Sequence, residues 1–316
     1  MDEAQDASIA ANFTRVQDLW FADHGLVLQA EDRLFRVSGG ILSARSSVFR
    51  DMLAIPQSKS RAQIDGCPVV VLDDSGMDAE YFLRAIFDAS FFERPPASTT
   101  LPTVAGVLKL STKYGVEFLR RRALLHLSTA LAGSLDEWDE TRSTATFHAP
   151  GCQFLCLLLV DSLALTWAIP AAMYAASCSP VLEILDGVPC EETHVRLPPV
   201  LQRACLVARA ALAVNQHHDI YRFLRASAVD GCRAPDVCPR RRLAMLDIYS
   251  GITQVNPLIL LTSSLWADTA GLLCEACCSR AEAEHREARQ AIWDSLPVLF
   301  DLPSWEQLHA ARTADL

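Results

Sequence analysis

The sequence predicts an α+β domain at the N-terminus, followed by an all-α helical domain. Short runs of strand-forming residues occur before residue 76, and helical patterns follow them. Beyond Gly151 the chain shows helical patterns without strand-like alternation. Of its 316 residues, 51% are hydrophobic and 21% charged. That length is ample for a buried core and exceeds what one compact domain usually holds, so we expect two domains.

Short strands and short helices open the α+β domain. Residues 26–29 form an apolar strand, and residues 33–37 can pair with it across a two-residue turn. Two short helices are predicted at 41–44 and 48–53, because their apolar residues fall on one face. A continuous apolar run at 69–72 then predicts a strand that is covered on both faces.

Helices complete the first domain and form all of the second. Apolar residues recur at helical spacing in 82–89, 104–115 and 119–130. The second domain is predicted to contain helices at 152–167, 170–178, 198–215, 217–228, 239–250, 256–283 and 284–295. We therefore expect a disordered N-terminus at 1–14, the α+β domain at 15–133, a linker at 134–150 and the helical domain at 151–310.

Charge and hydropathy exclude several classes of function. The net charge is −10, whereas a protein that grips a phosphate backbone normally carries a basic excess, so no nucleic acid is expected as a partner. The acidic start lacks the basic and apolar regions of a secretory signal, which predicts a cytoplasmic or nuclear protein that is not secreted. Residues 154–176 resemble a membrane span, but Asp161 and Pro170 favour a buried helix pair, so no membrane association is expected.

A spaced pattern between residues 34 and 49 carries a family resemblance. A strand that ends near an aromatic residue leads into a helix with apolar, small and hydroxyl residues at fixed offsets, and a later Lys113-Tyr114-Gly115-Val116 matches a final helical hairpin. This arrangement resembles the BTB/POZ domain over residues 15–133. The signature positions are Phe35, Ile41, Leu42, Ala44, Ser46 and Phe49. Most of them are expected in the core, Phe35, Leu42 and Phe49 above all.

Three further segments, at 18–23, 169–174 and 293–305, resemble a large mushroom-type fungal group of BTB-domain proteins with a helical C-terminal domain. The resemblance implies an interaction or adaptor protein that binds other proteins. Its partners would be another BTB chain or a cullin of a ubiquitin ligase. Ser38 and Gly39 replace the family's His-Arg pair, whose basic residue helps to form many BTB dimer interfaces. A monomeric or heteromeric state therefore stays open.

Eleven cysteines in a chain without a secretory signal are expected to be reduced thiols. Two pairs stand out, Cys232-x5-Cys238 and Cys274-x2-Cys277. Thiolates three residues apart share a helix face, and two pairs complete the tetrahedral shell of a structural zinc ion. The hypothesis is a zinc site at Cys232, Cys238, Cys274 and Cys277, in which Cys278 or His285 can replace one ligand.

Other interpretations of these cysteines stay open. Reduced cysteines also fill small spaces in a core. A thioredoxin-like role for Cys274-x2-Cys277 is disfavoured, because that motif starts a helix after a strand, whereas this one is predicted inside a helix.

The C-terminal segment between Trp293 and Leu308 is rich in apolar and aromatic residues, interrupted by prolines. It is predicted to pack back across the helical domain, because an exposed cluster of this size would favour aggregation. The alternative is an exposed segment that recognises a partner through its aromatic residues.

The sequence contains none of the common catalytic motifs. It has no glycine-rich phosphate loop, no Gly-x-Ser-x-Gly elbow and no His-Glu-x-x-His. The prediction is therefore an interaction or adaptor protein, not an enzyme. The alternative is a metal- or cysteine-dependent enzyme in the helical domain. A closed site with four thiolates favours the scaffold, whereas three ligands and an open position favour catalysis.

Overall fold

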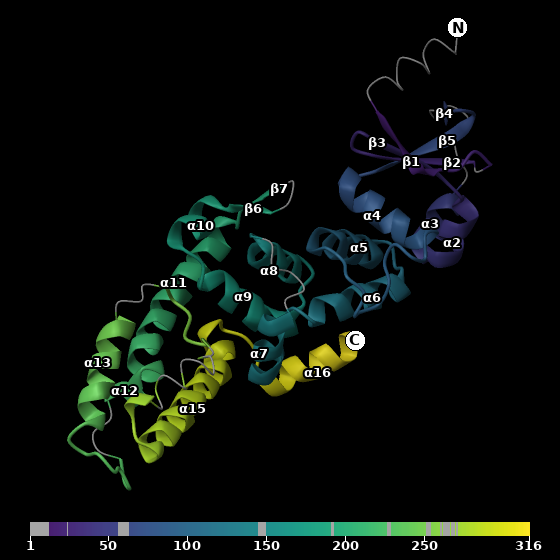
Figure 1. The fold of residues 1–316 in the computed structure, drawn as a ribbon. Coiled ribbons are helices and arrows are strands. Elements are labelled where there is room, and N and C mark those ends of the chain that lie inside the picture. The colour runs from purple at the N-terminus through teal and green to yellow at the C-terminus, as the bar shows by residue number, and fades with distance from the viewer. Residues whose placement is uncertain are drawn as a thin grey trace. The chain divides into compact units, whose positions relative to one another are not determined.

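The computed structural model describes residues 13–23, 25–55, 63–144, 150–190, 193–225, 229–250, 254–259, 261, 266, 269 and 271–316. The chain divides into two compact units. Figure 1 labels the helices and strands and colours the chain by residue number. The first unit runs to Ala130 and takes in the last two residues, and the second runs from Leu131 to Ala314. A mixed α/β unit is thus followed by a mostly helical one, as predicted.

Among its described residues, the first unit contains a five-stranded sheet of order β1-β3-β2-β5-β4 and five helices. Strands β2 and β3 form an antiparallel hairpin, β5 runs parallel to β2, and β1 runs parallel to β3. The elements are β1 (Thr14–Trp20), β2 (Leu26–Ala30), β3 (Arg33–Val37), α2 (Gly39–Arg45), α3 (Ser47–Ala54), β4 (Gln63–Ile64), β5 (Cys67–Leu72), α4 (Gly76–Phe87), α5 (Leu101–Lys113) and α6 (Glu117–Ser128).

The predicted hairpin and the helices after it are confirmed, and two details differ. Thr14 was expected in a disordered segment, but its N–H donates to the carbonyl of Asp32 at 2.7 Å and it starts strand β1. The rest of that segment, up to residue 12, lies outside the described residues. Strand β5 is covered on both faces only in part: Val69 is buried but Val71, on the same face, is 63% exposed, whereas Val70 and Leu72 on the other face are both buried.

Serine side chains fix the two short helices α2 and α3. Ser38 caps α2 by accepting a hydrogen bond from the N–H of Ile41, and Ser46 caps α3 by accepting one from the N–H of Phe49 at 3.0 Å. The Ser46 hydroxyl also donates to the carbonyl of Tyr114 at 2.5 Å. Ser46 therefore ties helix α3 to the end of α5.

In the part that the structure describes, the second unit contains helices and one short hairpin. Its elements are α7 (Leu135–Thr144), α8 (Cys152–Ser162), η1 (Thr166–Ala168), α9 (Ile169–Ser177), α10 (Val181–Asp186), β6 (Val188–Cys190), β7 (Thr193–Val195), α11 (Pro199–Asn215), η2 (Gln216–Ile220), α12 (Arg222–Arg225), α13 (Cys238–Ser250), α15 (Glu275–Leu299) and α16 (Trp305–Asp315). Helices α8 and α9 are the helix pair predicted for the most apolar stretch, and they pack on each other.

Several predictions for this unit are wrong. The expected linker contains helix α7, whose Leu135 and Trp138 are buried, so its apolar residues anchor it although the segment is mostly polar. The unit is not purely helical, because β6 and β7 pair antiparallel, and three-residue strands are too short to produce a visible alternation. The predicted break at 283/284 does not exist, since α15 is continuous from Glu275 to Leu299.

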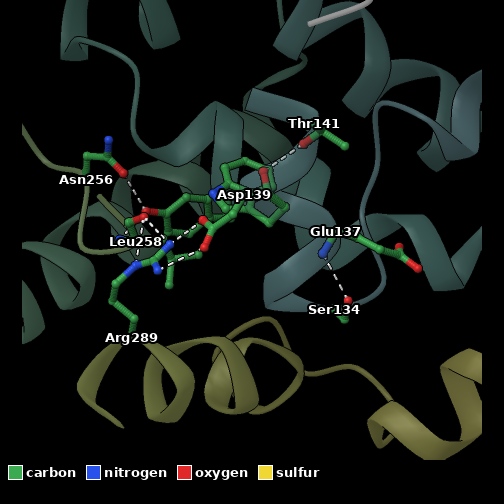
Figure 2. Close-up of polar contacts among 9 residues, drawn as sticks. Ser134, Glu137, Asp139, Thr141, Asn256, Leu258 and Arg289 are labelled. Atoms are coloured by element: carbon green, nitrogen blue, oxygen red, sulfur yellow. Dashed lines mark hydrogen bonds and ion pairs between the residues drawn. The ribbon is translucent and has the colours of Figure 1, made fainter. Parts of the chain in front are cut away.

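A buried polar network joins α7, α9 and α15 to the segment 254–258 (Figure 2). The guanidinium of Arg289, which is 3% exposed, pairs with both carboxylate oxygens of Asp139 and donates to the carbonyl of Leu258 at 3.1 and 3.3 Å. The hydroxyl of Tyr174 accepts from the N–H of Leu258 at 2.8 Å and bonds the side-chain oxygen of Asn256 at 2.9 Å. These bonds hold an irregular segment inside the helical unit.

The aromatic C-terminal segment packs back onto α15, as predicted. The rings of Trp293 and Trp305 stack with centroids 5.2 Å apart, and the indole N–H of Trp305 donates to the carbonyl of Trp293. Leu308 is buried. Among the described residues, no helix is both long and apolar enough to cross a membrane.

Candidate metal centre

Four cysteines from three segments of the second unit converge on one point. Cys232 lies between α12 and α13, and Cys238 is the first residue of α13. Cys274 is the N-cap residue of α15, and Cys277 lies in the first turn of that helix. All four sulfur atoms lie within 4.8 Å of one another. These are the four cysteines that the sequence spacing proposed as ligands.

Local backbone structure brings each pair into place. In the segment before α13, the N–H of Cys232 donates to the carbonyl of Val229 and the N–H of Cys238 donates to that of Ala234, both at 3.0 Å. Gly231, directly before Cys232, has a φ of +78°, a left-handed conformation that favours glycine. Two successive turns thus bring the Cys232 sulfur back toward Cys238.

The Cys274-x2-Cys277 motif was predicted inside a helix, and that placement is wrong. Cys274 has extended backbone and caps α15, because the described residues before it are not a continuation of that helix. The helical spacing still applies to the first turn, so the two sulfurs face the same side. The motif therefore projects both thiols from a helix N-terminus toward the segment that carries Cys232 and Cys238.

Backbone N–H groups point at these sulfurs. The N–H of Cys274 donates to the sulfur of Cys238 at 3.4 Å. Hydrogen bonds from the N–H groups of Cys277 and Arg233 lower the pKa of the Cys274 thiol to about 6. Burial, with hydrogen bonds to Cys232 and Cys274, raises the pKa of the Cys277 thiol to about 12. The hydrogen bonds to Cys274 therefore favour its thiolate, which is the form of cysteine that binds a metal ion.

The sulfur geometry fits a tetrahedral ion. Zinc binds thiolate at about 2.3 Å, which places the sulfurs of a tetrahedral site about 3.8 Å apart. The sulfurs of Cys232 and Cys274 are 3.8 Å apart. Because the other sulfurs lie within 4.8 Å of these, small side-chain rotations complete the shell. The four cysteines can therefore hold a metal ion such as zinc.

The cluster is sealed on one side and open on the other. Cys238 and Cys277 are buried and form a small apolar core with Leu273, against which Val229 and Ala234 pack. Cys232 and Cys274 are half-buried. Among the described residues, this is the sole group of three or more cysteine, histidine, aspartate or glutamate side chains placed to share an ion.

The two proposed substitute ligands lie elsewhere. Cys278 is buried and its thiol hydrogen-bonds the carboxylate of Glu282, so it belongs to a different face of α15. His285 packs edge-on against Phe223, with ring centroids 5.8 Å apart. Burial, together with the charge of Arg289, lowers the pKa of His285 to about 4, so this imidazole is neutral at pH 7.

Most of the residues that carry the family resemblance are buried in the first unit. Phe35, Leu42 and Phe49 are fully buried in the first unit, and Ser46 is the buried cap of α3. Ile41 and Ala44 are exposed, because they lie on the outer face of α2. The signature is thus mainly core, as expected.

Sequence reasoning missed one residue that acts on the cysteine cluster, Arg233. Arg233 acts on Cys274 through its backbone N–H, and every residue except proline carries that group, so no side-chain pattern marks it. Its position directly after Cys232 was the sole available signal.

No family model matches the chain, and no curated protein matches it either.

Proposed function

We propose that the protein is a non-catalytic interaction protein whose helical unit is closed by one structural zinc ion. The observation that carries the proposal is the set of four thiols within 4.8 Å of one another. Zinc with four cysteine ligands has no open position for water or substrate, which is the arrangement of structural sites. The competing enzyme would need three protein ligands and a free position, so the four-thiol set supports the scaffold instead.

The ion would join elements that are distant in sequence. Cys238 starts α13 and Cys277 lies in α15, while Cys232 belongs to the segment that leads into α13. A zinc ion at this point fixes that segment against the start of α15. Because a metal site binds the folded state and not the unfolded chain, its binding free energy adds to the stability of these elements.

The first unit supports the interaction part of the proposal. Its hairpin, helix pair, strand and helices follow each other in the order that the resemblance to BTB/POZ domains implies. We therefore propose that this unit is a BTB-type interaction domain and that the chain works as an adaptor. In its most specific form, the adaptor brings a protein substrate to a cullin-type ubiquitin ligase.

An exposed apolar and basic surface on this unit is our candidate contact, and we call it the Phe118 surface. Ile41 of α2, Val48 of α3 and Phe118 of α6 are each 40% exposed. The guanidinium of Arg45 lies 5.5 Å from the centre of the Phe118 ring and so links α2 to α6. Large apolar side chains with arginine are typical of protein interfaces.

Metal content tests the zinc part. The full chain, purified without chelators, is expected to carry one zinc ion in native mass spectrometry. Cys277→Ser removes a ligand and is expected to lose the ion, whereas Cys278→Ser changes the neighbouring buried thiol and should retain it. Equal zinc in both variants, or none in the unchanged chain, would contradict the four-cysteine site.

Affinity capture tests the interaction part. Phe118→Glu places a charge on the exposed surface and is expected to lose the captured partners, because a carboxylate replaces the apolar anchor. Val71→Glu is the matched control, since Val71 is 63% exposed in strand β5 of the same unit. A cullin that is recovered with the unchanged chain and Val71→Glu but lost with Phe118→Glu supports the ligase adaptor. Identical recoveries from all three chains would overturn this assignment of the surface.

A further inference from the structure

Helix α11 has an apolar face that the described residues of the chain leave exposed. Val200, Val207 and Val214 are 78%, 65% and 65% exposed, and they recur every seven residues. Arg203 and Ala210, which are also exposed, lie between them on the same side. We call these five residues the α11 stripe. Its spacing is the a and d spacing of a helix that pairs with another helix.

The stripe is distinct from the face that holds α11 in its unit. Cys205, Ala208 and Leu212 are buried and point to the opposite side of the helix. The guanidinium of Arg209 donates to the carbonyls of Ser177 and Cys178 at 3.3 and 3.0 Å, so α9 occupies that side. The valines of the stripe are therefore not needed to bind α11 to its own unit.

We propose that the α11 stripe pairs with the same stripe of a second copy of this chain, in antiparallel orientation about Val207. A seven-residue repeat of valines is self-complementary about its central member. Under two-fold symmetry, Val200 of one copy meets Val214 of the other, and Val207 meets itself. Valine is an apolar residue of the kind that packs in the seam between two helices.

The surface beside the C-terminal end of α11 has a hollow that would receive a valine side chain of the other copy. A hollow of about 350 Å³ lies at the C-terminal end of the stripe, lined by Ala213, Val214, His217, His218 and Arg225. In the antiparallel pair, Val200, the most exposed valine of the stripe, reaches this hollow on the other copy. The same contact is repeated at the opposite end, as a closed two-fold interface requires.

Charge selects the antiparallel arrangement. Helix α11 contains two arginines and no acidic residue, and Arg203 is the one on the stripe. In a parallel pair the two Arg203 side chains would stand side by side. In the antiparallel pair they are about 12 Å apart along the axis, at 1.5 Å per residue. That separation exceeds the Debye length of about 8 Å at physiological salt, so their repulsion is largely screened.

The area is close to what a dimer requires. The neighbouring helix α10 is bound to α11, since the side chain of Gln202 donates to the carbonyl of Leu185, which also accepts from Arg196 just before α11. It adds its own exposed apolar residues, of which Leu182 is 71% exposed. Covering the exposed apolar residues of α10 and α11 would remove roughly 600 Å² from each copy, approaching the roughly 800 Å² per partner of a standard interface.

Light scattering coupled to size exclusion tests the proposal on the full chain. The unchanged protein is expected to have twice its mass of 34.7 kDa at micromolar concentrations. Val207→Glu should give a monomer, because it places two carboxylates together on the two-fold axis. Val298→Glu is the matched control and should stay dimeric, because Val298 is an 84% exposed helical valine outside the stripe. A monomeric unchanged chain, or a Val207→Glu variant that stays dimeric, for instance through the first unit, would overturn the proposal.

Crosslinking gives an answer even where Val207→Glu fails to fold. A photo-crosslinking amino acid in place of Arg203 is expected to label residues 210–214 of the other copy. Labelling of residues 200–206 indicates a parallel pair, and the absence of crosslinked dimer indicates no pairing through α11. Either result would contradict the antiparallel stripe. Zinc content is measured separately, so this test can fail without affecting the metal centre.

Discussion

Replacing Asp139 by asparagine is expected to lower the opening free energy of the second unit by about 3–5 kcal/mol, the range observed when one partner of a buried ion pair is removed. Arg289 is 3% exposed, and Asp139 is the carboxylate that neutralises it. Asparagine keeps the shape but leaves the guanidinium buried without its counter-charge. The loss should appear in hydrogen exchange of residues 254–259 and of α15, which the network in Figure 2 joins.

The matched control for this prediction is Asp136→Asn on the same helix. Asp136 is exposed, so its neutralisation should change the opening free energy by less than about 0.5 kcal/mol. The double variant Asp139→Leu with Arg289→Met is expected to recover much of the loss, because both charges are removed together. Equal effects of Asp136→Asn and Asp139→Asn would contradict the structural role of the pair.

Removing the metal is expected to release the segment around Cys232 and the start of α15 together. A high-affinity zinc chelator, or Cys277→Ser, should abolish the exchange protection of residues 229–238 and 274–280. The physical reason is that Cys232 and Val229 pack against a small apolar core, which consists of Cys238, Leu273 and Cys277. Structural zinc sites in short peptides contribute about 10–16 kcal/mol of apparent binding free energy, so the effect on these elements should be large.

The same measurement contains its own controls. Protection of strands β2 and β3 in the first unit should not change on chelation, because none of the four cysteines belongs to that unit. Cys278→Ser should leave 229–238 protected. Added zinc should restore protection in the chelated chain but not in Cys277→Ser. Unchanged exchange after complete metal removal would show that the ion does not stabilise this part of the fold.

The sequence predicted which four cysteines lie together better than it predicted the structure around them. A spacing of two residues between cysteines places both on one side of a helical turn, and this holds whether the turn starts a helix or lies inside one. The four cysteines were therefore found although the helix start was misplaced. Cys278 and His285 failed as substitutes because the same periodicity turns them toward Glu282 and Phe223.

Tertiary contacts set the limits of prediction elsewhere. The polar composition of 134–150 concealed helix α7, which buried Trp138 and the Asp139–Arg289 pair hold in place. Those two charged residues are 150 positions apart, and sequence spacing carries no signal across that distance. The seven-residue repeat of valines in α11 is visible in the sequence. The sequence alone does not tell whether such a repeat packs in the core or lies on the surface, and the exposed fractions of the valines decide this.

X-ray absorption at the zinc edge of the full-length protein tests the central claim most directly. The account predicts a single shell of four sulfur atoms at about 2.3 Å from the metal. A shell that contains nitrogen or oxygen at about 2.0–2.1 Å would replace the closed four-cysteine site with an open or histidine-containing one, and would contradict the account.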